Sequence, residues 1–242
     1  MGHQVAICQP HYIPWIGYFE MIDRVDEFIF LDDVDVIQRD WKTRNRIRKE
    51  RASTETKWLS VPIVHECRRK TPIFEARIGG DGTWRQRHLD AFAMVYAETQ
   101  FFAEASTLLE DCLAEPAETI GDLNVNMVQR ICAHLGIETP LRRASDTPTA
   151  GHKTEKLVAL CKVAQATHYL ANNGSAGYLQ PERFAAANID LAFQDYEHPN
   201  YEQKNGKHAL PFLSHLSVLD LIGNHGPASL EILRQGRPSL AV

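Results

Sequence analysis

Residues 8–19 read Cys-Gln-Pro-His-Tyr-Ile-Pro-Trp-Ile-Gly-Tyr-Phe, and the rest of the chain is organised around this stretch. Its two prolines lock φ and remove backbone donors, so neither a regular helix nor a central strand should run through it. An apolar run, Val5 to Cys8, precedes it, and a helix-like run from Phe19 to Arg24 follows. The order strand, loop, helix predicts a ligand site at the carboxyl end of the first strand.

A second strand is predicted at Phe28 to Leu31, because four consecutive apolar residues suit a strand that is covered on both faces. It ends at Asp32-Asp33. Strand, loop, helix and strand within about 30 residues is the size of a βαβ crossover unit. We therefore expect a parallel pair, with the 9–18 loop and Asp32-Asp33 at the same strand ends.

The remaining sequence predicts a mainly helical middle followed by further strands. Apolar residues at helical spacing indicate helices over residues 84–97, 101–114, 119–135 and 154–166. Short strands are expected at residues 58–64, 73–78, 168–171 and 189–193. The polar connector 140–148 predicts a boundary between an N-terminal α/β domain with a helical extension, 1–140, and a C-terminal α/β portion, 141–242. The alternative is that both portions pack into one domain.

Composition narrows the class of protein. The 242 residues are 44% hydrophobic and 24% charged, with a formal net charge of −5, which argues against a dedicated nucleic-acid binder. No apolar run approaches the roughly 20 residues that span a bilayer, and the N-terminus shows no secretion signal. The five cysteines are scattered without a CxxC pair. We expect a cytoplasmic protein with reduced thiols.

The basic stretch 39–51 has two interpretations. A charge run is usually a solvated helix face, and composition alone favours that interpretation. Its place after a predicted strand end favours a second one, because the planar guanidinium groups of Arg44 and Arg46 suit phosphates or carboxylates. Lys153, which opens a helix after Gly151, is a similar candidate for binding an anion, although the spacing is not that of a P-loop.

The loop residues and the acidic pair also have a structural and a functional interpretation. His11 is a candidate acid or base, or a hydrogen-bonded loop residue, and its aromatic neighbours favour a small-molecule pocket. Asp32 and Asp33 suit either Mg²⁺ or a helix cap, and no further ligand at a fixed spacing supports a metal. The turns that carry Tyr178 and residues 199–203 likewise have both a structural and a functional interpretation.

Several segments resemble the WbqC-like protein family in the same order along nearly the whole chain. The opening signature, residues 9–19, is specific, and the later segments are weaker: 26–34, 41–47, 58–62, Lys153 with Leu157, 177–179, 198–203 and 216–220. The sequence departs from the family pattern at residues 36–39 and 221–224. The resemblance implies a transferase whose relatives are encoded near surface-polysaccharide and amino-sugar genes.

The same opening also resembles HIGH-type nucleotidyltransferases, in which x-Gly-His contacts a nucleotide phosphate. Tyr18 stands where that histidine would be, which argues against adenylyl transfer and leaves nucleotide binding open. We therefore predict an α/β fold with an N-terminal Rossmann-like (HUP-like) parallel sheet and a mainly helical middle and C-terminal part.

Three functions remain open at this stage. The first is a transferase that moves a small acyl or aminoacyl group onto the amine of a nucleotide-linked amino sugar, for a surface polysaccharide or a specialised metabolite. The second is a nucleotide-dependent ligase or nucleotidyltransferase that uses ATP with Mg²⁺. The third is a non-catalytic accessory protein of a biosynthetic enzyme. The first requires an acyl donor, for which aminoacyl-tRNA is the one nucleic acid that fits, and a homodimer is also considered.

In the first hypothesis His11 is the base, because an attacking amine must lose a proton, and Asp32 and Tyr18 complete the catalytic set. No metal ligand is predicted. The predicted substrate-binding residues line the pocket, neutralise a diphosphate or carboxylate, or orient polar groups: Gln9, Tyr12, Trp15, Asp33, Arg44, Asn45, Arg46, Lys153, Tyr178, Tyr201 and Gln203.

Overall fold

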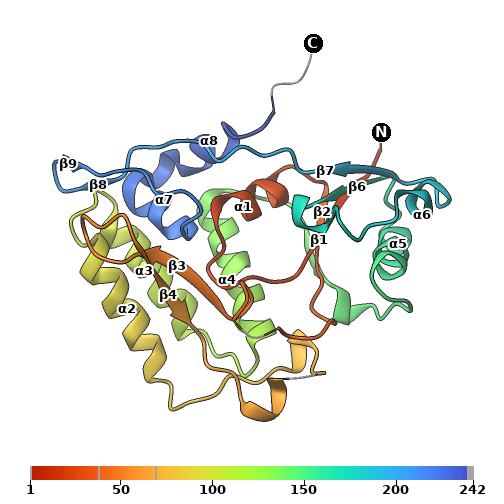
Figure 1. Cartoon of the computed structure of the whole chain (residues 1–242), viewed down its shortest axis with the longest axis horizontal. Coiled ribbons are helices and arrows are strands. Elements are labelled where there is room, and N and C mark those ends of the chain that lie inside the picture. Colours follow the sequence, from red (N-terminus) through yellow and green to blue (C-terminus); the bar gives the residue numbers. More distant parts are fainter. Residues whose placement is uncertain (1, 38, 69, 239–242) are drawn as a thin grey trace.

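Five parallel strands form the central sheet of the computed structural model, which describes residues 2–37, 39–68 and 70–238 (Figure 1). The strands are β1 (Gln4–Cys8), β2 (Glu27–Phe30), β5 (Leu141–Arg143), β6 (His168–Ala171) and β7 (Asp190–Phe193). Their order across the sheet is β5-β2-β1-β6-β7. Counted along the chain this is 3-2-1-4-5, the doubly wound order, whose direction reverses between β1 and β6.

The predicted α/β fold and the predicted parallel pair are confirmed. β1 and β2 lie in parallel register, with Val5 opposite Glu27 and Cys8 opposite Phe30. Helix α1 (Ile16–Asp23) joins them and starts three residues earlier than the sequence indicated. The sheet takes two strands from before residue 140 and three from after it, so both predicted portions contribute to one sheet.

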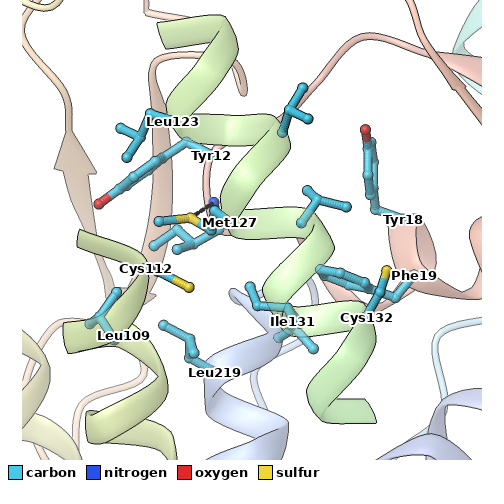
Figure 2. Packing of buried hydrophobic residues seen from close by; sticks show 14 of the residues in the cluster. Tyr12, Tyr18, Phe19, Leu109, Cys112, Leu123, Met127, Ile131, Cys132 and Leu219 are labelled. Carbon is cyan, nitrogen blue, oxygen red and sulfur yellow. Dashed lines mark hydrogen bonds between the residues drawn. The ribbon is translucent and has the colours of Figure 1, made fainter. Parts of the chain in front are cut away.

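Alternation along the strands divides the core into two clusters, because successive side chains of a strand point to opposite faces. Ala6, Cys8 and Phe28 belong to the larger cluster, together with helices α1 to α4 and α7. Val5 and Ile7 belong to the smaller cluster, beneath the helices that follow β5 and β6. Figure 1 accordingly shows α2–α4 on one side of the sheet and α5 and α6 on the other. Figure 2 shows the larger cluster, with Tyr12 beside Met127 of α4.

Most of the helices were predicted within a few residues. α4 ends where expected, because Gly136 adopts a left-handed φ of 76° that caps the helix. No described helix combines the length and apolar character needed to cross a bilayer. The helices are α2 (Thr83–Tyr96), α3 (Phe102–Ala114), α4 (Ile120–Leu135), α5 (Thr154–Val163), α6 (Pro181–Ala185), α7 (Val218–His225) and α8 (Ser229–Arg234).

Two predictions for the N-terminal half were wrong. The basic stretch is not a helix face: β3 (Arg44–Arg48) pairs antiparallel with β4 (Thr56–Ser60) in a sheet of its own. The strand predicted at 73–78 is instead the 3₁₀ turn η2 (Ile73–Glu75), because the chain enters through Pro72 and makes only isolated bridges afterwards. The short remaining elements are β8 (Lys204–Asn205), β9 (His208–Ala209), η1 (His65–Arg68), η3 (Ala144–Asp146), η4 (Asn173–Ser175) and η5 (Gly226–Ala228).

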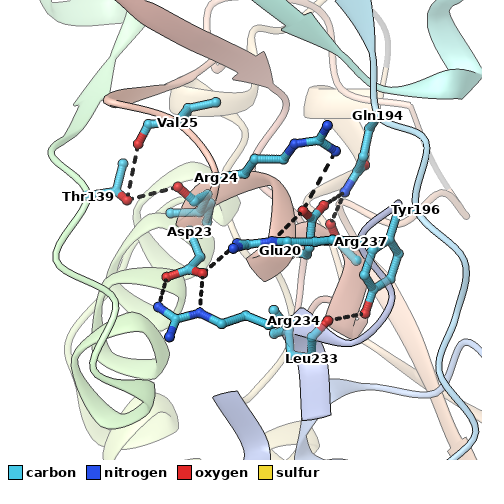
Figure 3. Close-up of polar contacts among 12 residues, drawn as sticks. Glu20, Asp23, Arg24, Val25, Thr139, Gln194, Tyr196, Leu233, Arg234 and Arg237 are labelled. Atoms are coloured by element: carbon cyan, nitrogen blue, oxygen red, sulfur yellow. Dashed lines mark hydrogen bonds and ion pairs between the residues drawn. The ribbon is translucent and has the colours of Figure 1, made fainter. Parts of the chain in front are cut away.

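An ionic cluster ties the C-terminal helix to α1 (Figure 3). Arg234 makes two hydrogen bonds of 2.8 Å to the carboxylate of Asp23, and Arg237 reaches the buried Glu20 at 3.1 Å. Gln194, directly after β7, donates to the other oxygen of Glu20 at 2.5 Å. Bidentate guanidinium–carboxylate pairs fix geometry as well as charge, so this cluster sets the position of α8 against the first helix.

Candidate functional site

The loop after β1 is held in place by two buried asparagines. Asn124 of α4 donates to the carbonyls of Pro10 (3.0 Å) and Lys42 (2.8 Å). Asn45 of β3 donates to the carbonyls of Tyr12 (3.0 Å) and Ile13 (2.9 Å). Ile13 has a φ of 34°, which is costly for a β-branched residue. The predicted binding residue Asn45 therefore shapes the loop, with its amide nitrogen fully engaged by backbone.

A lysine–carboxylate pair lies where the strand order reverses. The Lys42 ammonium donates to Gln9 Oε1 at 2.7 Å and pairs with Asp40. The Lys42 side chain is only 3% exposed, whereas that of Asp40 is 29% exposed. On the β6 side, Asn172 approaches the Cys8 thiol, with 3.8 Å between Nδ2 and Sγ. An ammonium has three donors, and among the described residues Gln9 and Asp40 accept from two of them.

His11 is half-buried next to this pair and lies 5.0 Å from the Tyr18 ring, centroid to centroid. Burial, and then the positive charge of Lys42, lower the pKa of His11 to about 3. The imidazole is therefore neutral near pH 7 and can accept a proton. Burial raises the pKa of the Cys8 thiol to about 11, so this cysteine is not a thiolate nucleophile.

The other two predicted catalytic residues are engaged in internal hydrogen bonds. The Tyr18 hydroxyl donates to the Gln9 carbonyl at 3.0 Å, and burial raises its pKa well above the usual value. Asp32 is fully buried and accepts from Arg143 Nε (2.6 Å), Ser145 Oγ (2.8 Å) and the Ser145 amide (3.0 Å). Asp32 thus joins the end of β2 to the end of β5, and both its oxygens are occupied.

A second lysine–carboxylate pair lies on the opposite side of the same edge. Lys156, in the first turns of α5, contacts Asp33 Oδ2 at 2.5 Å and the Thr149 carbonyl at 3.3 Å. Asp33 Oδ1 is buried and has no hydrogen-bond partner among the described residues. Lys153 is exposed just before α5, with a φ of 51°. The described residues bring together no group of three side chains able to hold a metal ion.

Tyr178 is half-exposed and lies at this edge on the β6 side. Burial, followed by the nearby Cys8, raises the pKa of its phenol, which therefore stays protonated at neutral pH. Its carbonyl accepts from Thr154 Oγ1, 3.4 Å away, at the start of α5. Gln9, His11, Asp33, Lys153 and Tyr178 therefore occupy one edge of the sheet, as the sequence predicted for the loop and the acidic pair.

Three further predicted residues lie on the hairpin side instead. The guanidinium carbon of Arg44 lies 4.1 Å from the centre of the Trp58 ring, and Arg46 Nε donates to the His215 carbonyl at 3.0 Å. Trp15 stacks on His215 with 4.8 Å between ring centroids. These side chains form a surface that continues outward from Lys42 along β3.

The remaining predicted binding residues are in the interior. Tyr12 is fully buried, and 2.7 Å separates its hydroxyl oxygen from His88 Nδ1. Tyr201 and Gln203 both donate to Asp220 Oδ2 at 2.8 Å. Their polar groups are occupied by other residues of the chain, which explains their polarity without a ligand.

Four further polar residues at this edge of the sheet were not predicted from the sequence. Lys42 and Asp40 belong to the basic stretch, where only the arginines were singled out. Asn172 follows a predicted strand directly, and its place at the carboxyl end of a parallel strand was the available signal. Lys156 gave no comparable signal, because a lysine within a helix is usually solvated.

A family model and a related protein both match this chain along nearly its whole length. No solved structure matches the chain. Rv1507c of Mycobacterium tuberculosis, described as an uncharacterized protein, is 36% identical over 237 residues, which cover 97% of this chain and 99% of that protein. Residues 9–232, from the loop that opens the site to the last helix, match the sequence model of one family. The chain belongs to the WbqC-like protein family.

Proposed function

We propose that this protein is a transferase that moves a small acyl or aminoacyl group onto the amine of a nucleotide-linked amino sugar. The observation that carries this proposal is the neutral imidazole of His11 beside the Lys42–Asp40 pair, at the point where the strand order reverses. Ligands of doubly wound sheets bind in the crevice at this point. The family context of the chain supports an amino-sugar acceptor.

The reaction needs one group that handles a proton. The amine nitrogen attacks the carbonyl carbon of an activated ester or thioester, so a C–N bond forms and the C–O or C–S bond breaks. A ring nitrogen of His11 takes the proton from the amine and returns it to the departing alkoxide or thiolate. A base with a pKa of about 3 is weak, so the proposal relies on the position of the imidazole beside the bound amine.

The other groups at this edge have supporting roles in the proposal. In the proposal, the third donor of Lys42 stabilises the oxygen on which negative charge develops in the tetrahedral intermediate. Lys153 and Tyr178 are exposed on the α5 side, and we assign them to binding the diphosphate of the acceptor. Tyr18 and Asp32 are positioning residues, because their hydrogen bonds fix Gln9 and Ser145.

His11→Ala tests the proposal. Turnover should fall at least a hundredfold, because general-base catalysis contributes about that much. The melting temperature should stay within about 2 °C, since the imidazole makes no hydrogen bond with the described residues that the substitution would remove. Acyl transfer is measured by mass spectrometry with a UDP-linked amino sugar and acyl donors of the thioester and aminoacyl-ester classes. Glu202→Gln, on the exposed surface after Tyr201, is the control. Full activity in His11→Ala rules out His11 as the base.

One observation favours the nucleotide-dependent ligase as a second candidate. The strand order 3-2-1-4-5 is that of dinucleotide- and nucleotide-binding sheets. Against it, Tyr18 is buried and its hydroxyl is bonded to Gln9, so it does not replace a phosphate-binding histidine. Thermal stabilisation by ATP with Mg²⁺, together with pyrophosphate release, would favour the ligase over the transferase. No response to ATP and a clear shift with the UDP-linked amino sugar is the result we expect.

A further inference from the structure

Two exposed tryptophans lie side by side on the outer face of the hairpin. Trp41 precedes β3 and Trp58 lies in β4, and their ring centroids are 5.4 Å apart. Trp41 is 37% exposed and Trp58 40% exposed, whereas Leu59, the next residue on β4, is buried. Tryptophan is rarely left so open unless its face has a use, because the ring carries a large apolar area.

Two guanidinium groups lie against these rings. Arg44 lies 4.1 Å from the centre of the Trp58 ring, and Arg46 lies 5.8 Å from that of Trp41. Neither arginine makes an ion pair in the part of the chain that the structure describes. Both are therefore unneutralised positive charges on a protein whose formal net charge is −5. Arginines stacked on aromatic faces are suited to phosphates that carry planar bases.

An open groove of about 660 Å³ continues from this face toward the tip of the hairpin. Its walls include Arg46, Thr56 and the ion pair of Lys49 with Glu55 on the hairpin, and Phe212 and Ser214 opposite. Arg46 is the wall's cation that is not paired with a carboxylate in the described part of the chain. Ligand sites usually have volumes of about 300–1,000 Å³. The groove and the tryptophan pair share Arg46, so one ligand can contact both.

The length of this surface selects the ligand. Lys42 points into the candidate site, and Lys49 lines the groove at the other end. The strand β3 (Arg44–Arg48) lies between them, and its five extended residues span about 16 Å at about 3.3 Å per residue. A single nucleotide is too short to cover that distance. An activated acyl donor that carries a nucleotide at its far end is long enough.

We infer that the Trp41–Trp58 face binds the nucleotide portion of the acyl donor. A base stacks on the two indoles, phosphates contact Arg44, Arg46 and the groove, and the acyl end reaches Lys42 and His11. This inference rests on the proposed transferase and names the substrate class for one half of its site. Coenzyme A thioesters and the 3′ end of an aminoacyl-tRNA share this chemistry, and the experiment separates them.

Binding is measured by calorimetry and by quenching of tryptophan fluorescence with two probes. One probe is coenzyme A, and the other is a short single-stranded RNA that ends in CCA. We expect one of them to bind, with an affinity that falls as salt rises because phosphates are neutralised. Trp58→Ala should weaken binding at least fivefold, since stacking on an aromatic ring contributes substantially for each base. Arg44→Gln should also weaken it.

Lys57→Ala is the matched control, because this residue precedes Trp58 and its side chain points to the other face of β4. It should bind the probe like the unmodified protein. Circular dichroism and the melting temperature confirm that each variant is folded. If neither probe binds, or if Trp58→Ala binds as tightly as the unmodified protein, the inference is wrong. Binding of the UDP-linked amino sugar, measured separately, shows whether the proposed function survives that result.

Discussion

The polar groups at the carboxyl edge of the sheet differ from those buried beneath the hairpin in how many of their hydrogen-bonding positions are filled. At the edge, described residues fill two of the three donors of Lys42, and the imidazole of His11 is unprotonated. Beneath the hairpin, Arg48 is 1% exposed and donates to Gln203 Oε1 at 2.6 Å, to the Pro211 carbonyl at 2.9 Å and to the Ser53 carbonyl. The three hydrogen bonds of Arg48 thus stay within the chain, although Asp220 Oδ1 in the same network has no partner among the described residues.

The buried network also contains a carboxylate that needs its neighbours. Asp220 is 1% exposed, and burial raises its pKa, while hydrogen bonds from Tyr201 and the charge of Arg48 act in the opposite direction. A buried charge without compensation is strongly destabilising. The network therefore contributes to fold stability. Tyr201 and Gln203 hold its geometry through their hydrogen bonds to Asp220.

The largest expected effect comes from removing the buried arginine. Arg48→Met should lower the free energy of unfolding by about 3–5 kcal/mol, because it leaves Asp220 and two backbone carbonyls uncompensated. Arg46→Met, two residues earlier on the same strand but only half-buried, should lower it by about 1 kcal/mol, because only the hydrogen bond to the His215 carbonyl is lost. Urea denaturation followed by circular dichroism measures both. Equal losses in the two variants would contradict the division between scaffold and site.

The next effect concerns turnover. Lys42→Met should lower turnover at least tenfold and leave binding of the UDP-linked amino sugar nearly unchanged, because its hydrogen bond to the developing oxyanion, worth about 1.5–3 kcal/mol, is made only during the reaction. Stability should fall by only about 1 kcal/mol, since Asp40 stays partly hydrated.

The same variant should raise the pKa of His11 toward its ordinary value, because the Lys42 charge is one of the causes that lower it. NMR titration of labelled histidine measures this shift. Unchanged turnover, with an unchanged His11 titration, would place Lys42 with the scaffold residues.

The smallest effect is a dependence of stability on pH. Burial lowers the pKa of His88 to about 4, while an unfolded chain has the ordinary value of about 6.5. Below pH 6.5 the unfolded state binds a proton that the folded state does not, so stability falls as pH falls toward 4. His88 alone should account for about 1 kcal/mol between pH 6.5 and 5.5. Urea unfolding at both values should show a smaller change in His88→Gln. The same change in both proteins would show that His88 does not cause it.

The sequence allowed the sheet edge to be predicted because apolar runs and strand ends are local signals. Val5 to Cys8, Phe28 to Leu31 and the Gly136 cap all follow from neighbouring residues. The β3–β4 hairpin could not be predicted in this way, because arginines at every second position have the period of a strand but not its usual apolar pattern. The sequence also did not show which predicted site residues lie at the edge and which lie in the interior. Tyr12, for example, is buried against His88, which is 76 positions away in the sequence.

The left-handed turn at Ile13 has a consequence for how the site is assembled. Its backbone nitrogen contacts Met127 Sδ, 114 positions later, and its carbonyl is held by Asn45. A φ of 34° costs about 1–3 kcal/mol in isolation, so the turn is stable only once α4 has packed against it. Contacts so distant in sequence form late in folding. A growing chain on the ribosome therefore cannot fix this turn before residue 127 emerges, and the site also needs Lys153 and Tyr178, which are made later still.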